Sequence, residues 1–162
     1  MTYPDTVTHA DHLAVCDVLY RFAEGIDLRD FELYRSVFTD EIEVDYSSHR
    51  PGSAGRMRAD DWVERARRRF TALDATQHVM SNPRVSVDGN TAICSMYVVA
   101  HHHHRHAGRA DSYTLGGRYV DLLTRTDGRW RISRLALQVW WSEGNPALVG
   151  LTSPAQPSSR TS

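Results

Sequence analysis

The chain has 162 residues, of which 41% are hydrophobic and 24% are charged, and its formal net charge at pH 7 is −1. A chain of this size is expected to fold as one domain with a sizeable core, and its near-neutral charge excludes an electrostatic basis for binding nucleic acid or an anionic membrane. No apolar run reaches membrane-spanning length and no basic-then-apolar segment opens the chain, so we expect neither a membrane span nor a signal peptide.

All 19 basic residues are arginine. The absence of lysine excludes Schiff-base catalysis by a lysine, a pyridoxal phosphate anchor and a P-loop. Cys16 and Cys94 lie among apolar neighbours, which predicts buried free thiols and favours a reducing cytoplasm. The sequence also has no GxSxG and no GxGxxG motif, so the serine-triad and dinucleotide-binding classes lack their main support.

Three helices are predicted in the first half of the chain, after a flexible lead-in over residues 1–10. The first covers residues 11–26, with apolar side chains at helical spacing, and Asp27 follows at the rim of its apolar face. A short second helix covers 31–38. The third runs from Asp60 or Asp61 to Leu73. Its apolar stripe consists of Trp62, Val63, Ala66, Phe70 and Leu73, and its solvated outer face of Glu64, Arg65, Arg67, Arg68 and Arg69.

Strands dominate the rest of the chain. Residues 42–46 alternate with period two, and the Gly-, Ser- and Pro-rich segment 47–58 is expected to be a loop. The later strands are joined by Asp-Gly turns and by a longer connection, which predicts an antiparallel meander and an α+β fold. Their expected ranges are 76–87, 91–106, 112–126 and 129–142. The tail, residues 147–162, is expected to be partly disordered, although residues 147–151 could fold back over a pocket.

One acid and several histidines stand out as candidates for proton transfer near neutral pH. Asp27 ends the first helix, His78 opens a strand in the motif TQHVM, and His101 to His104 form a run near the end of the next strand. Elimination of water beside a carbonyl needs a base for the α-proton and an acid for the departing hydroxyl, and histidine can serve as either. A carboxylate bonded to an imidazole N–H would fix its tautomer.

Several stretches together resemble a known family. They are YRFAEGIDLRDFELYRSVF, IEVDY, TQHVM and GGRYVDLLTRTDGRWRI. Over about residues 11–146 they resemble the SnoaL-like branch of the NTF2-like superfamily, and within it scytalone dehydratase and related polyketide and steroid dehydratases or cyclases. The resemblance implies a cone in which a strongly bent antiparallel sheet packs on three N-terminal helices.

The resemblance also implies a set of catalytic residues. It places the family's helix-end aspartate on Asp27, its strand tyrosine on Tyr46 and its TQH histidine on His78. The second histidine falls on His103, or on His101 if the strands slip by two residues. The dehydratase's second tyrosine falls on Ile26, and its small polar pair on Gly117 and Tyr119, so the chain departs from scytalone dehydratase at these three positions.

The alternation of side chains along a strand extends this set to a pocket lining. If His103 faces the pocket, every second residue of its strand, counted back from His103, faces the pocket too. The strand register of the family adds every second residue of the last strand to the pocket lining. The expected substrate-binding residues are His101, Val99, Tyr97, Leu135, Leu137, Val139, Trp141, Phe22 and Tyr119. Cys94, Met96 and Val98 would then form an apolar outer face, which predicts a homo-oligomer, either a dimer or a trimer.

The sequence therefore favours a cofactor-free lyase or cyclase that acts on a hydrophobic, polyketide-like or polycyclic carbonyl compound. No carboxylate or thiolate completes a ligand set on either face of the histidine run, so we expect no functional metal. Two alternatives stay open: an isomerase using the same groups, and a non-catalytic binding subunit like the β subunit of ring-hydroxylating dioxygenases. Which histidine is base and which is acid also stays open. Only an enzyme requires Asp27 and His78 to lie within bonding reach.

Overall fold

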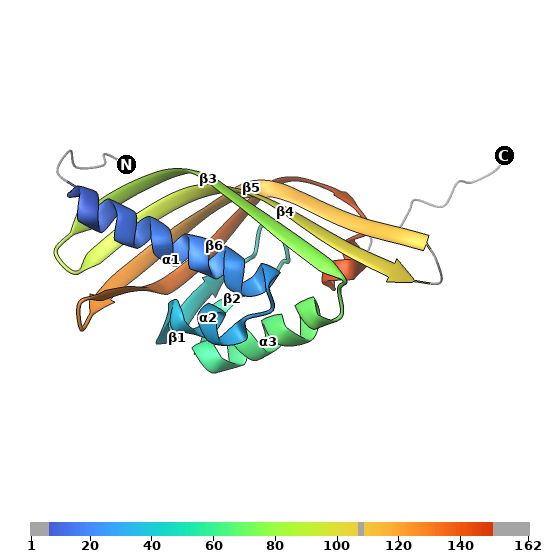
Figure 1. Cartoon of the computed structure of the whole chain (residues 1–162), viewed down its shortest axis with the longest axis horizontal. Helices are drawn as coiled ribbons and strands as arrows, with labels where there is room; N and C mark the ends of the chain where they lie inside the picture. Colours follow the sequence, from blue (N-terminus) through green and yellow to red (C-terminus); the bar gives the residue numbers. More distant parts are fainter. Residues whose placement is uncertain (1–6, 107–108, 151–162) are drawn as a thin grey trace.

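The computed structural model describes residues 7–106 and 109–150, which form three helices and a six-stranded sheet with strand order β2-β1-β6-β5-β4-β3. All three helices lie on one side of the curved sheet (Figure 1). The fold is the expected α+β cone. Its elements are α1 (His9–Asp27), α2 (Phe31–Ser36), β1 (Phe38–Asp45), β2 (Ala54–Arg58), α3 (Ala59–Thr71), β3 (Ala75–Asp88), β4 (Thr91–His106), β5 (Arg109–Thr126), β6 (Arg129–Gly144) and the 3-10 helix η1 (Pro146–Val149).

Helix α1 places an acid at the edge of the sheet. Its N-terminus is capped by Thr8, whose hydroxyl accepts a hydrogen bond from the backbone N–H of Asp11. The predicted apolar face is buried, and α2 approaches α1 so closely that a Cβ on Gly25 would lie 2.8 Å from the backbone nitrogen of Tyr34. The chain leaves the helix through Arg29, which has a φ of 60°. Asp27 therefore occupies the last position of the helix.

The sheet is mixed, whereas the sequence predicted a purely antiparallel meander. Strands β3 to β6 do form the meander, with positive φ angles in the turns at Gly89 and at Asp127–Gly128. Strand β1, however, pairs with β6 in parallel. Strand β2 pairs with β1, although segment 47–58 was expected to be a loop throughout. Phe38, expected in the second helix, is the first residue of β1.

A β-bulge in β3 reverses which residues of that strand face the helices. The pairing with β4 shifts by one residue between Ser81 and Arg84, where Asn82 has a φ of 55° and Pro83 has no N–H to donate. Before the bulge in the chain, Thr76 and His78 face the helices; after it, Val85 does. A shift of one residue moves every side chain beyond it to the other face.

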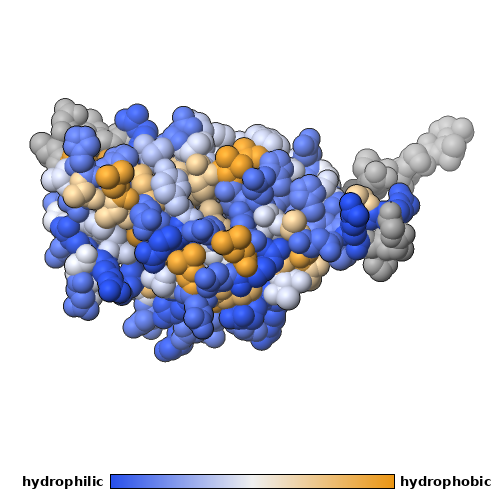
Figure 2. All heavy atoms as spheres, in the orientation of Figure 1, coloured by the Kyte–Doolittle hydropathy of each residue, from blue (hydrophilic) through white to orange (hydrophobic). Residues whose placement is uncertain are grey.

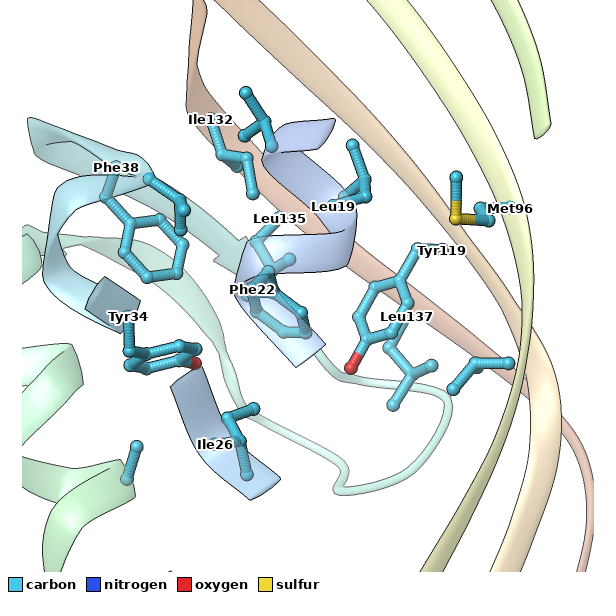
Figure 3. Close-up of a cluster of buried hydrophobic side chains, with 14 of the residues drawn as sticks. Leu19, Phe22, Ile26, Tyr34, Phe38, Met96, Tyr119, Ile132, Leu135 and Leu137 are labelled. Carbon is cyan, nitrogen blue, oxygen red and sulfur yellow. The ribbon is translucent and has the colours of Figure 1, made fainter. Parts of the chain in front are cut away.

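The core lies between the helices and the inner face of the sheet. Phe22 packs between Tyr34 and Tyr119, with ring centroids 5.2 and 5.3 Å away (Figure 3). Cys94 and Met96 belong to this core, so their predicted place on the outer face is wrong, and the same holds for Val98. The helical face of the molecule is mostly hydrophilic, with small separate hydrophobic groups (Figure 2).

The outer face of the sheet carries exposed aromatic side chains, but they are other residues than the apolar ones expected there. Tyr97 and Trp140 are 47% and 55% exposed and contact each other there with a centroid distance of 5.2 Å. Trp141 is 47% exposed and covers Gly116. The homo-oligomer inferred from an apolar outer face stays a prediction, now with these residues at its centre.

The two ends of the predicted domain lie only partly within the described residues. The flexible lead-in was expected over 1–10, but α1 already begins at His9, and residues 1–6 lie outside the described part. In the tail predicted over 147–162, residues up to Gly150 are described, and Val149 is buried against the core. None of the helices in the described part combines the length and apolarity that crossing a bilayer requires.

Candidate active site

The carboxylate of Asp27 is bonded to His78 in two ways. One oxygen, Oδ1, lies 2.7 Å from Nδ1 of the imidazole, and the other, Oδ2, accepts the backbone N–H of His78 at 2.7 Å. The imidazole side chain is 5% exposed and the Asp27 side chain 20%. The end of α1 and the start of β3 thus meet at one acid–histidine dyad, as the sequence predicted.

Two further side chains hold the carboxylate in place. The hydroxyl of Thr76, two residues before His78 on the same face of β3, donates to Oδ1 of Asp27 at 3.0 Å. That hydroxyl accepts a hydrogen bond of 2.7 Å from Arg29, whose guanidinium also donates to the backbone oxygens of Ile26 and Leu73. Arg29 therefore ties the end of α1 to the start of β3, and it fixes Thr76 in the orientation that serves Asp27.

The hydrogen bonds of Asp27 determine its charge. Burial alone would raise its pKa, but the hydrogen bonds and charge of His78, together with the Thr76 hydroxyl, outweigh burial and leave the pKa lowered. An ionised carboxylate can only accept, so Nδ1 of His78 must be the N–H of that contact. Whenever the imidazole is neutral, its other ring nitrogen, Nε2, carries the free lone pair.

His102, on the neighbouring strand β4, is the second histidine of the site. Its ring lies 5.8 Å from that of His78 and stacks on Phe70 at 6.0 Å. Its Nδ1 lies 3.1 Å from the backbone carbonyl of Tyr113 and so must donate, which again leaves Nε2 without a proton. Burial, and then the charge of His78, lower the pKa of His102 to about 4, so this ring is neutral at physiological pH.

Two tyrosines supply hydroxyl groups to the same site. The hydroxyls of Tyr46, directly after β1, and Tyr119, on β5, lie 3.1 Å apart. Burial raises the pKa of Tyr46 well above its ordinary value and also raises that of Tyr119. Both phenols therefore stay protonated, and the pair has one O–H free to donate to a ligand. The sequence-based alignment placed Tyr119 where the dehydratase has a small residue, and the structure gives it a place in the site.

These groups line a small, largely apolar cavity of about 50 Å³. That volume holds a few water molecules, so a ring compound would need the walls to move apart. Part of the wall comes from η1 and the turn after β1. Arg50 of that turn donates to the backbone oxygen of Val149 at 2.8 Å. The lining consists of Ile26, Tyr34, Tyr46, His49, Trp62, Arg65, Ala66, Arg69, Phe70, His78, Ala100, His102, Leu115, Tyr119, Leu137 and Val149.

The predicted facing of β4 is wrong by one residue. His78 pairs with Ala100 across the strands, so the inward residues of β4 are those that share a face with Ala100. His103 is exposed, and the ring of His101 stacks on that of His103 outside the cavity, with Nδ1 bonded to Thr114. Val99 and Tyr97 lie on that outer side as well.

The other predicted lining residues divide between the cavity, the core and the outer face. Leu137 lines the cavity, whereas Phe22 and Leu135 lie deeper, in the core. Val139 is partly buried against that core. Trp141 faces outward, because the pairing of β6 with β5 shifts by one residue between Val139 and Trp141. Residues 7–106 and 109–150 contain no cluster of potential metal ligands, and the absence of a functional metal stays a prediction.

The sequence reasoning missed His102 and the cavity residues of α3, although signals for them were present. Along β4, Ala92, Cys94, Met96, Val98 and Ala100 form an unbroken small or apolar set that leads to His102, whereas the alternate set contains Ser95 and Tyr97. Trp62 and Arg69 are seven residues apart, close to two helical turns, so they share one face. Val149 carried no signal beyond the expectation that residues 147–151 could cover a pocket.

Three comparisons place the chain among known proteins. The model of the SnoaL-like domain matches residues 7–136. A dehydratase from Aspergillus candidus is 23% identical over 158 residues, with 88% of this chain and 90% of that protein covered. The crystal structure of the Kfla4162 protein from Kribbella flavida has a TM-score of 0.80 at 27% identity and covers 86% of this chain and 97% of that one.

A further solved structure agrees with this fold. A scytalone dehydratase candidate from Novosphingobium aromaticivorans has a TM-score of 0.73 at 20% identity, and the match covers 94% of this chain and 96% of that one. At this identity the likeness concerns the fold alone. The family match, in contrast, spans most of the chain and includes both Asp27 and His78. The chain therefore belongs to the SnoaL-like domain family, and its fold is the NTF2-like cone.

Proposed function

We propose that the protein is a dehydratase that removes water from a ring-containing β-hydroxy carbonyl compound of the polyketide type. The observation that carries this proposal is the 2.7 Å contact between His78 and Asp27 at the wall of a small, largely apolar cavity. A buried imidazole with a free Nε2 and an ionised partner on Nδ1 is a base whose protonated form is stabilised. The dehydratase from Aspergillus candidus supports the reaction type.

In the first step, Nε2 of His78 takes the proton from the carbon beside the substrate carbonyl. The electron pair of that C–H bond forms an enolate, and the new imidazolium is stabilised by the carboxylate of Asp27. The free O–H of the Tyr46–Tyr119 pair donates to the carbonyl oxygen, where the negative charge develops. Hydrogen-bond donors fixed in a water-poor cavity are effective at this task.

In the second step, the enolate re-forms its carbonyl and the bond from the β-carbon to the hydroxyl oxygen breaks. The departing hydroxyl takes the proton from the His78 imidazolium, so water leaves and the ring nitrogen regains its lone pair. His102 is neutral and exposes an unprotonated Nε2, so it accepts a hydrogen bond from the departing hydroxyl rather than donating a proton to it. One histidine thus carries the proton in both steps, and no cofactor is needed.

The experiment is a turnover assay on bicyclic aromatic β-hydroxy ketones in D₂O, read by mass spectrometry and proton NMR. The proposal predicts loss of 18 mass units and an enone product with the wild-type chain, and no product with His78→Ala. An isomerase would exchange the α-hydrogen for deuterium or shift a double bond without loss of mass. A binding module would do neither, and either of these outcomes with every compound that binds would overturn the proposal.

A further inference from the structure

Arg69 lies in the wall of the cavity, although the sequence placed it on the solvated face of its helix. It is half-buried on α3 and lines the cavity together with Trp62 and Ala66, which precede it by seven and three residues. These spacings put the three side chains on one face of the helix. The arginine is therefore part of the site and not of the outer surface of α3.

None of the hydrogen bonds or ion pairs between the described residues involves Arg69. Its neighbours on the outer face of α3 are paired: Arg67 and Arg68 both contact Glu64, at 3.4 and 3.0 Å. A half-buried guanidinium carries five donors and a full charge, and burying it without a partner is unfavourable. The site thus holds a strong cationic donor whose bonds a ligand can complete.

The charges around Arg69 are also uncompensated. Among the described residues that line the cavity there is no aspartate or glutamate, whereas Arg65 lies at its exposed edge. Burial and the charge of Arg50 lower the pKa of Arg69. Burial first, and then the charges of Arg50 and Arg69, lower the pKa of His49. The arginine contributions to these two shifts, though smaller than that of burial, reflect positive charge beside the cavity, which a bound anion would relieve.

Asp27 and Asp121 do not supply that anion. Both oxygens of Asp27 are occupied by His78 and Thr76. Asp121 is fully buried, and burial raises its pKa well above the ordinary value, which favours the neutral form of this acid. Neither of them lines the cavity.

We propose that Arg69 binds a carboxylate of the substrate, so that the preferred substrates of this site are ring compounds that carry one acidic group beside the reacting β-hydroxy carbonyl unit. The guanidinium fork matches the two oxygens of a carboxylate. The aromatic and aliphatic walls, formed by Trp62, Phe70 and Leu115 among others, take the ring. The reacting β-hydroxy carbonyl unit in this inference rests on the proposed function. The acidic group does not, because its binding to Arg69 can be tested without any reaction.

The test compares benzoate with benzamide, two ring compounds of nearly the same shape that differ in charge. Dissociation constants are measured by NMR titration on the full chain. Benzoate should bind at least about 10-fold more tightly than benzamide, since hydrogen bonds to a charged group are stronger than those to a neutral one. Arg69→Gln should abolish this preference, and Arg69→Lys, which keeps the charge but not the fork, should retain part of it.

Arg68→Gln is the matched control, because Arg68 is the next residue of the same helix and its side chain is 78% exposed. It should bind both probes as the wild-type chain does. His78→Ala should keep the preference for benzoate, which would exclude the imidazolium as the anion site. If Arg69→Gln fails to fold, the wild-type chain still decides the question: benzoate should raise the pKa of His49 and His102 in an NMR pH titration, and benzamide should not.

Equal binding of the two probes to the wild-type chain would overturn the inference, and so would an unchanged preference in folded Arg69→Gln. These results are distinct from failure of the proposed dehydration. If His78→Ala loses turnover but the wild-type chain shows no preference for benzoate, only the inference of an acidic group on the substrate is refuted. A benzoate preference that depends on Arg69, in a chain that dehydrates none of the compounds it binds, would refute only the reaction.

Discussion

Asp27 binds the imidazole Nδ1 of His78 with one oxygen and the backbone N–H of the same residue with the other, each at 2.7 Å. The ring and the strand that carries it are thus held by one carboxylate. A side chain fixed at both points loses little further freedom when it reacts, which is the condition for a well-oriented base.

Asp27→Asn is expected to leave the fold intact and to lower kcat strongly, because the amide stabilises the imidazolium less well than a carboxylate does. His78→Ala should lower kcat by about 10²- to 10⁴-fold, the usual contribution of one general acid or base. The double variant should lose much less than the product of the two single losses, since the pair acts as one unit. Steady-state kinetics and thermal melts measure both effects.

Asp17→Asn is the control for the Asp27 series, because Asp17 lies on the same helix with a 60% exposed side chain. It should retain wild-type turnover. Near-wild-type turnover in folded Asp27→Asn and folded His78→Ala would refute the dyad as the source of catalysis.

His102→Gln should reduce kcat by about 10- to 100-fold through loss of the ring that faces the departing hydroxyl. His103→Gln should stay within about 2-fold of wild type, because an exposed side chain on the outer face touches neither the cavity nor the dyad. Parallel kinetics on the two variants decide which residue is the second histidine. If His103→Gln lowered kcat more than His102→Gln, the second histidine would be His103, as the family resemblance implied.

Tyr46→Phe should lower kcat by about 10²-fold, the order of loss found when one donor to a developing oxyanion is removed. Tyr119→Phe should lower it less, because the remaining Tyr46 hydroxyl can still turn to the substrate. The wild-type rate should not fall between pH 8 and 10 through ionisation of either phenol, since burial raises both pKa values. A pH profile of kcat tests this, and a decline that vanishes in Tyr46→Phe would contradict it.

Asp121 provides a prediction about stability. Burial raises its pKa in the folded chain, so the folded state binds a proton more tightly than the unfolded state. Its favourable contribution is complete below the unfolded pKa of about 3.9 and is lost as the pH rises above it. Asp121→Asn removes the ionisation and should stabilise the fold at pH 8 by about 1–3 kcal/mol. Chemical denaturation at pH 8 and pH 4 should show this gain at pH 8 only.

The order of elements, the Asp-Gly turns and the dyad could be predicted from the sequence because they depend on local patterns. Which side chains of β4 face the helices could not be obtained by counting residues from the turn between β3 and β4. Asp88 pairs with Thr91, and continued pairing at that register would place His101 opposite His78. The bulge at Asn82 and Pro83 removes one residue from the count and brings Ala100 opposite His78 instead. A bulge is favoured by its tertiary context, and alternation alone does not reveal it.

For Arg69 the sequence did contain the information needed, namely its position on the helix relative to Trp62. The run of neighbouring arginines, which suggests a solvated face, obscured it. Four arginines in a five-residue stretch suggest a solvated face, and the predicted pair of Glu64 and Arg68 is indeed present at 3.0 Å. The position of Arg69 on the helix, seven residues after Trp62, nevertheless puts it in line with the aromatic side of the helix. Position on the helix, and not charge, determines which arginine enters the cavity.

The hydrogen bond between Arg50 and Val149 joins two segments that contribute to the cavity wall and contain none of the proton-transfer groups. We therefore expect ligand entry and exit to depend on the chain after β1 and on η1, and the proposed chemistry to depend on α1, β3 and β4. Such a division lets natural variation alter which molecules are admitted while the reaction itself is preserved. It gives a physical reason why one cone can adopt new substrates by changing a few residues at the periphery of its sheet.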